Sequence, residues 1–260
     1  MDTYQFQSMG VRQIFLGALR HYRVNFLKLV GIAAPGTLIG GLAFQAIWIY
    51  GYAEIGGPQV LAAALPYTAI TVFQSLVVTA AGTFVVSQDL LGRSINVGEA
   101  YSRVLGSLFP LLGVLIIFML GSLALSTIAA GIGLMVFIPG IVVYIWFCLA
   151  APVVIIEREG GFGALKRSRV LVKGFFDKAF FLVVWLTLVE AFVVILVLSL
   201  PLLIGSFPGF PSLLSFLSIC LSLPINTFRI ISTTMLYYDL RVRKEGYDLQ
   251  ILAQELATPL

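Results

Sequence analysis

The sequence predicts an all-α polytopic membrane protein with six transmembrane helices, arranged as three hairpins, and with both termini in the cytoplasm. Hydrophobic residues make up 60% of the 260-residue chain and charged residues 11%, with a mean hydropathy of +1.03. A soluble domain carries about 25% charged residues. Fifteen of the sixteen Lys and Arg residues fall in four short polar stretches, which long apolar runs separate.

Six apolar runs are long enough to cross a membrane, because a helix of about 20 residues spans a hydrocarbon core of about 30 Å. We expect helices because a backbone in lipid must satisfy its hydrogen bonds within its own segment. Each run also has a proline in it or at its edge. The predicted spans are Leu27–Tyr50, Leu61–Val86, Leu108–Ala130, Leu134–Ile156, Ala179–Leu203 and Leu213–Tyr237.

The positive charges predict the orientation of the spans, because Lys and Arg are retained on the cytoplasmic side. The opposite loops, Gly51–Val60, Gly131–Gly133 and Ile204–Ser212, are short and hold no Lys or Arg. We interpret the net charge of +4 as a basic belt that faces anionic lipid headgroups, and we expect no nucleic-acid partner. The cytoplasmic cations are Arg12, Arg20, Arg23, Lys28, Arg93, Arg103, Arg158, Lys166, Arg167, Arg169, Lys173, Lys178, Arg241, Arg243 and Lys244.

A repeated unit, consisting of an amphipathic segment and a two-span hairpin, organises the single domain 1–260. The units cover about 9–88, 94–157 and 162–238, and 239–260 form a cytoplasmic tail with a short helix. In the third segment Lys166, Arg169 and Lys173 form a basic stripe, with Phe162 expected away from it. Such helices lie in the headgroup plane. The alternative is that they are only the cytoplasmic ends of long spans.

Glu190 and Arg229 are ionisable residues inside predicted spans five and six. At ~1.5 Å per residue they lie roughly 17 and 14 Å from the cytoplasmic ends of their helices. Charges at this depth are costly unless they are paired, so we predict an ion pair within the third hairpin. Such a pair either fixes the register of the two helices, as a structural contact, or acts as a relay for protons or substrate.

The motifs of common enzyme chemistries are missing from the sequence. His21 is the only histidine, and there is no GxxxxGK[ST] nucleotide-binding loop. The two cysteines, Cys148 and Cys220, lie in separate apolar runs and support neither a disulfide framework nor a zinc site. We therefore expect no catalytic, cofactor or metal site, and we expect that the protein is not an enzyme.

Three stretches resemble a known family: Leu236–Leu249, Ala164–Ser168 and Phe15–Phe26. The first is similar to a recurring ending of the glycerophosphoryl diester phosphodiesterase membrane-domain family and its uncharacterised relatives. The resemblance implies a six-span body in the cytoplasmic membrane of a bacterium or archaeon. It implies no enzymatic activity, because the histidines and the soluble phosphodiesterase domain of the fused members are missing here.

The polar residues just below span six have mixed signs, so they can bridge to the basic segments or to lipid phosphates. We expect the cytoplasmic face to contact anionic headgroups or protein subunits. The residues predicted to do so are Arg20, Arg23, Lys166, Arg167, Arg169, Lys173, Asp239, Arg241, Arg243 and Lys244.

Two functions follow from these observations. The first is a non-catalytic scaffold or accessory subunit of a membrane complex that acts through lipid and protein contacts. The alternative is a transporter or lipid-handling protein with a cavity near Glu190 and Arg229. A water-accessible or lipid-sized cavity that reaches Glu190 favours the alternative, and a dry, fully packed core favours the scaffold.

Overall fold

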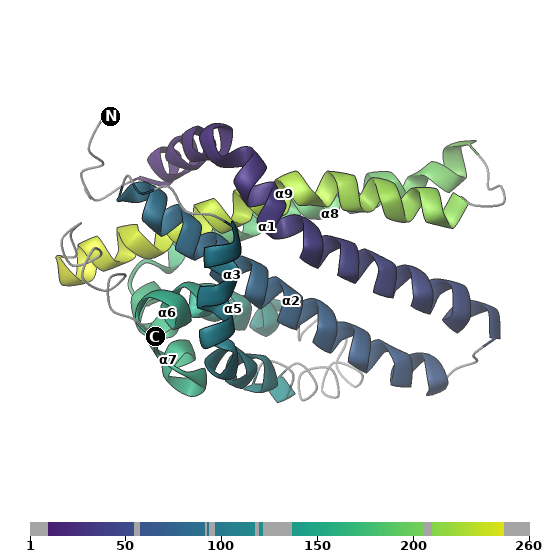
Figure 1. Cartoon of the computed structure of the whole chain (residues 1–260), viewed down its shortest axis with the longest axis horizontal. Coiled ribbons are helices and arrows are strands. Elements are labelled where there is room, and N and C mark those ends of the chain that lie inside the picture. The colour runs from purple at the N-terminus through teal and green to yellow at the C-terminus, as the bar shows by residue number, and fades with distance from the viewer. Residues whose placement is uncertain are drawn as a thin grey trace.

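The computed structural model describes residues 10–54, 58–91, 93, 97–117, 120–121, 137–204 and 210–246, and every regular element among them is an α-helix. Four long helices run along the molecule: α1 (Val11–Glu54), α2 (Pro58–Leu90), α8 (Phe176–Ile204) and α9 (Phe210–Glu245). The shorter helices α3 (Val97–Gly106), α5 (Phe137–Phe147), α6 (Ala150–Ile156) and α7 (Gly161–Val172) gather toward the end where α1 begins and α9 ends (Figure 1).

The described helices support a membrane protein with fewer demonstrated spans than the six predicted. Three stretches are long and apolar enough to cross a membrane: Ala69–Leu90, Phe176–Val197 and Phe216–Glu245. A fourth is counted if Val97–Gly106 and Leu108–Ile117, which meet at a bend of 67°, form one span. Part of predicted span three and the start of span four fall on residues 122–136, outside the described residues.

Predicted span four is two helices, α5 and α6, where a single helix was expected. Pro152 has no N–H to donate to the carbonyl four residues earlier, which weakens the helix at that point. Ser168 of α7 compensates at the break, where its Oγ accepts from the Leu149 N–H at 3.2 Å and donates to the Trp146 carbonyl at 2.7 Å. These two hydrogen bonds of Ser168 therefore fasten α7 to the end of α5.

The three amphipathic segments differ in how they join the spans that follow. The first is continuous with its span, because α1 runs for 44 residues without interruption, or about 66 Å. The second and third, α3 and α7, are separate helices. Gly174, with φ of +93°, lies between α7 and α8, in a backbone region that favours glycine. The placement of these segments in the headgroup plane stays a prediction.

Helix α9 packs most extensively against α1, and it also crosses α2 within the buried core. Gly82 lies so close to α9 that a Cβ atom there would sit 2.5 Å from Ile230 Cγ2. Further along the crossing, the buried Tyr238 hydroxyl donates to Ser87 Oγ at 2.6 Å, and Ser87 donates to the Thr83 carbonyl at 2.6 Å. Small residues on α2 thus permit close approach, and hydrogen bonds within the apolar core set the register.

Polar contacts also fasten α1 to its neighbours near a proline. Pro35 lies within α1 and cannot donate to the carbonyl of the preceding turn. The Tyr101 hydroxyl of α3 donates to the nearby Ile32 carbonyl at 2.6 Å. His21 Nδ1 lies 2.8 Å from Asp89 Oδ2 of α2. These contacts hold α1 against α2 and α3, and α1 also packs along α9, which in turn contacts α8.

Candidate functional site

The structure joins α8 and α9 through the two ionisable residues that the sequence places at membrane depth. The Arg229 guanidinium forms an ion pair with the Glu190 carboxylate. The side chains remain 25% and 33% exposed, respectively, so the pair is only partly enclosed by protein. Pairing neutralises two charges that would each be costly in an apolar environment.

Arg229 also lines a cavity of about 180 Å³, which is bordered by parts of α2, α5, α6, α7, α8 and α9 and by Val114, and Glu190 is not among its lining residues. Five residues that carry a hydroxyl line this cavity: Ser75, Thr79, Tyr144, Thr187 and Thr233. The other lining side chains are apolar or aromatic, apart from Cys148. The cavity therefore combines one cation and several small polar groups with apolar walls, the usual character of a ligand site.

A second, smaller cavity of about 50 Å³ lies on the other side of Arg229, between α1, α2 and α9. Gln74 lines it, and its buried Oε1 accepts no hydrogen bond from any described residue. A polar space of this size has room for water. Ser75, Thr79 and Arg229 line both cavities, so these residues separate one polar space from the other.

One side of the larger cavity is covered by α6 and α7. Ala150 and Ala151 of α6 and Leu165 of α7 contribute to its lining and are all buried. The chain turns sharply between the two helices, where Arg158 adopts a φ of +60° and Gly161 a φ of +42°. This turn folds α7 back beneath the cavity.

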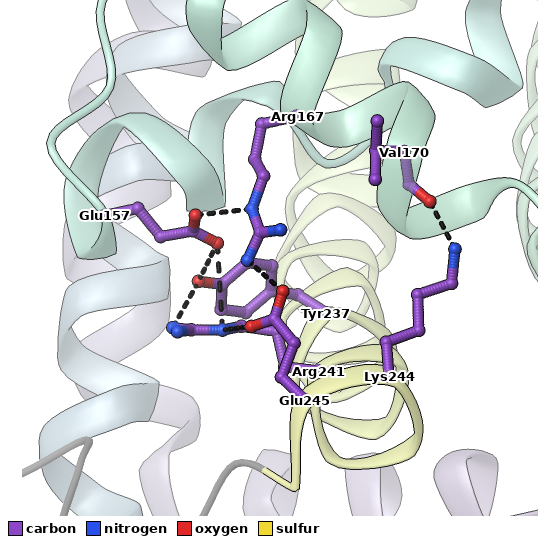
Figure 2. Close-up of polar contacts among 7 residues, drawn as sticks. All are labelled: Glu157, Arg167, Val170, Tyr237, Arg241, Lys244 and Glu245. Atoms are coloured by element: carbon purple, nitrogen blue, oxygen red, sulfur yellow. Dashed lines mark hydrogen bonds and ion pairs between the residues drawn. The ribbon is translucent and has the colours of Figure 1, made fainter.

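Five side chains, which we call the clamp, fasten α6 and α7 to the end of α9: Glu157, Arg167, Tyr237, Arg241 and Glu245 (Figure 2). Arg167 Nε donates to Glu157 Oε2 at 2.6 Å, and its other arm pairs with Glu245. The buried Tyr237 hydroxyl donates to Glu157 Oε1 at 2.8 Å and accepts from Arg241 at 3.0 Å. Arg241 also bonds Glu245 at 3.1 Å. Two cations and two carboxylates thus balance each other.

Arg167 is held in its charged form by this arrangement. Burial alone would lower the pKa of its guanidinium, but the hydrogen bonds and charges of Glu157 and Glu245 outweigh burial and raise that pKa above its ordinary value. The connection between α7 and α9 is therefore ionic over the whole physiological pH range.

Further contacts extend the link between α9 and its neighbours. Lys244 donates to the Val170 carbonyl at the end of α7 (Figure 2) and to the carbonyl of Lys173, the next residue after that helix. The partial negative charge at a helix C-terminus stabilises a cation in this position. Asp239, whose side chain is fully buried, accepts from Lys178 of α8 at 3.1 Å and from Arg243 at 3.0 Å.

The prediction that all ten cytoplasmic charged residues face lipid or a partner is wrong for several of them. Asp239 and Arg241 are buried, and Arg167 and Arg243 are half-buried in ion pairs. They turn inward because carboxylates from other turns or helices neutralise them there. Lys244 is exposed but is held against the carbonyls of α7. The remaining predicted residues, Arg20, Arg23, Lys166, Arg169 and Lys173, are exposed.

The exposed face of α7 also differs from the expectation in one apolar residue. Phe162 was expected away from the basic stripe, but it is 73% exposed. It lies one turn from Lys166, and that spacing brings it onto the same face. Arg169 stacks over the Trp146 ring at 4.5 Å. An aromatic residue among cations is typical of a helix at a membrane surface.

Sequence reasoning missed Glu157 and Tyr237, on which the clamp depends. The signal for Glu157 was present, because Glu157 and Glu159 are acidic residues beside an otherwise cationic stretch. Tyr237 gave no local signal, since a tyrosine at the end of an apolar run is common at membrane interfaces.

Among the described residues, no group of three His, Cys, Asp or Glu side chains could hold a metal ion. No family model, curated protein or solved structure matches this chain.

Proposed function

We propose that this chain is a non-catalytic integral membrane protein that holds a solute or a lipid in the cavity beside Arg229, as a transporter or lipid-handling protein. This is the second of the two functions expected from the sequence. The observation that carries it is the position of Arg229, which lines both polar cavities inside a bundle of apolar helices.

A scaffold needs no such cavity. Close packing stabilises a helical membrane protein, and a charged residue within it costs free energy unless it is paired. In this bundle, a guanidinium and several hydroxyl-bearing residues lie among the apolar residues that line a space of about 180 Å³. An unfilled space beside a charged residue lowers the stability of the bundle. A ligand-binding site, by contrast, requires such a space.

The proposed setting is the cytoplasmic membrane of a prokaryote, with six spans and both termini inside. The described spans, the alternation of cationic segments and the resemblance at Leu236–Leu249 support this setting. In this orientation the clamp and α7 lie on the cytoplasmic side of the cavity, where they separate it from the cell interior.

Thiol accessibility tests the proposed function in purified protein reconstituted into liposomes. In a background with Cys148 and Cys220 replaced by Ala, Thr79→Cys lies at both cavities, whereas Ile231→Cys lies in the packed core with 0% exposure. A small water-soluble methanethiosulfonate reagent is expected to modify Thr79→Cys at least ten times faster than Ile231→Cys. Equal protection of both would show a dry core and would favour the scaffold.

The scaffold role keeps one observation in its favour, which is the exposed face of α7. Phe162, Lys166, Arg169 and Lys173 are all exposed on that short helix, and they suit anionic headgroups or an acidic subunit. Replacing the three cations by Gln is expected to weaken binding to vesicles that contain anionic lipid. Purification in native membranes should then recover fewer associated proteins if α7 also binds a subunit.

A further inference from the structure

We infer that the cavity beside Arg229 takes the carboxylate head of a membrane amphiphile, and that Glu190 is an internal substitute which the incoming head displaces from Arg229. The inference rests on the proposed function and adds the chemical class of the ligand. It also assigns Glu190 and Arg229 one role, as a competing anion and its receptor.

The chemistry of the head follows from the pair itself. A carboxylate already pairs with the Arg229 guanidinium in this structure, and Arg229 also lines the cavity, so a carboxylate is the group that this cation would bind there. A guanidinium has five N–H donors, and one carboxylate uses at most two of them. A ligand in the cavity can therefore bond Arg229 while Glu190 is leaving, so no step leaves the cation bare at membrane depth. Glu190 takes up a proton as it leaves, because its carboxylate would otherwise be an unpaired charge in the apolar interior.

The walls of the cavity suit the head and the first part of an alkyl chain. Thr79, Thr187 and Thr233 line the cavity together with Arg229, and the remaining surface is mostly apolar. An engineered cavity of about 150 Å³ admits benzene, so the about 180 Å³ here holds a carboxylate and a few methylene groups. A long tail cannot fit and must leave the cavity.

The tail has a route out between α5 and α8. Tyr144 of α5 is 39% exposed although it lines the cavity, and Thr187 of α8 is exposed as well. The surface of α8 beyond them is apolar, with Trp185 and Phe192 exposed by 58% and 67%. In a membrane this surface meets lipid chains. A single-chain amphiphile therefore lies with its head at Arg229 and its tail along α8.

Photolabelling in nanodiscs of zwitterionic lipid tests the inference directly. The probe is a long-chain fatty acid with a diazirine in its chain, used at a pH that ionises the acid, and the matched probe is the corresponding alcohol. We expect the acid to label peptides of α5 and α8 several times more strongly than the alcohol. Glu190→Gln removes the competing carboxylate and should raise labelling by the acid a further several-fold.

The neutral double variant Glu190→Gln/Arg229→Gln leaves no unpaired charge, so it keeps the protein folded while removing the receptor cation. Its labelling by the acid should fall to that of the alcohol, whereas Arg12→Gln, which removes an exposed cation of α1 outside the cavity, should label like the unmodified protein. Equal labelling by acid and alcohol in all variants would overturn the inference.

Butyrate separates the two possible sources of the head, because it supplies the carboxylate without a tail. We expect it to leave labelling unchanged at concentrations where unlabelled oleate competes. Competition as strong as that of oleate would mean a soluble anion and would overturn the assignment to a membrane amphiphile. If Thr79→Cys reacts with the thiol reagent and the acid shows no preference, this inference fails and the proposed function stands.

Discussion

Removing the charge of Glu157 should loosen the clamp that holds α7 to α9. Glu157 accepts hydrogen bonds from Arg167 at 2.6 Å and from Tyr237 at 2.8 Å, and its side chain is 12% exposed. Glu157→Gln has nearly the same shape but keeps only one acceptor oxygen. One of the two hydrogen bonds is therefore lost, and Arg167 and Arg241 share a single carboxylate, that of Glu245.

The size of the effect follows from this count. A hydrogen bond to a charged group contributes about 1.5–3 kcal/mol, so Glu157→Gln should lower the free energy of unfolding by about that amount. Glu159→Gln is the matched control, because it makes the same change two residues away on an exposed side chain. Its effect should stay within about 0.5 kcal/mol.

Unfolding in mixed detergent micelles, followed by tryptophan fluorescence, measures both variants. Trp146 lies beside α7 and reports on the region of the clamp directly. A double-mutant cycle with Arg167→Gln should give a coupling of about 0.5–3 kcal/mol between the two positions. If Glu157→Gln is no less stable than Glu159→Gln, the clamp does not hold α7 and the reasoning is wrong.

Two further predictions concern packing between helices, and thermal unfolding measures both. Gly82→Ala should lower stability by about 1–3 kcal/mol, because the added Cβ meets the stiff, β-branched side chain of Ile230. Ile230→Leu in the same chain should restore part of the loss. Gly98→Ala, which has open space around it, should be neutral or stabilising. Tyr101→Phe should cost about 1 kcal/mol by removing the hydrogen bond that the Tyr101 hydroxyl donates to the Ile32 carbonyl, and unchanged stability would mean that this bond does not hold α3 to α1.

Much of the architecture could be predicted from the sequence because the bilayer makes strong and simple demands. Long apolar runs must be helical, and the cations that interrupt them mark their ends. The pairing of Glu190 with Arg229 could also be predicted, because each is the only residue of opposite charge near the other within the apolar spans of the third hairpin. The break between α5 and α6 did not follow, because Pro152 alone does not say whether a helix will bend or separate.

The orientation of the cytoplasmic cations was the least predictable part. Arg167 and Lys166 are neighbours in the sequence, yet Arg167 turns into the clamp and Lys166 is exposed. The difference depends on Glu157 and Glu245, which belong to α6 and α9 and meet Arg167 only after the chain has folded. No local pattern states which of two adjacent cations will find a carboxylate.

By itself the sequence determined the class of the protein and its helices, because solvent preference acts on each segment separately. It also determined which residues are too polar for their depth, and so which ones need a partner. Only the tertiary structure decided that Arg229 lines two cavities, that α7 covers the larger one and that the charges of the tail hold α7 in place. These features arise where α2, α7, α8 and α9 meet, and they depend on distances between helices that no single segment encodes.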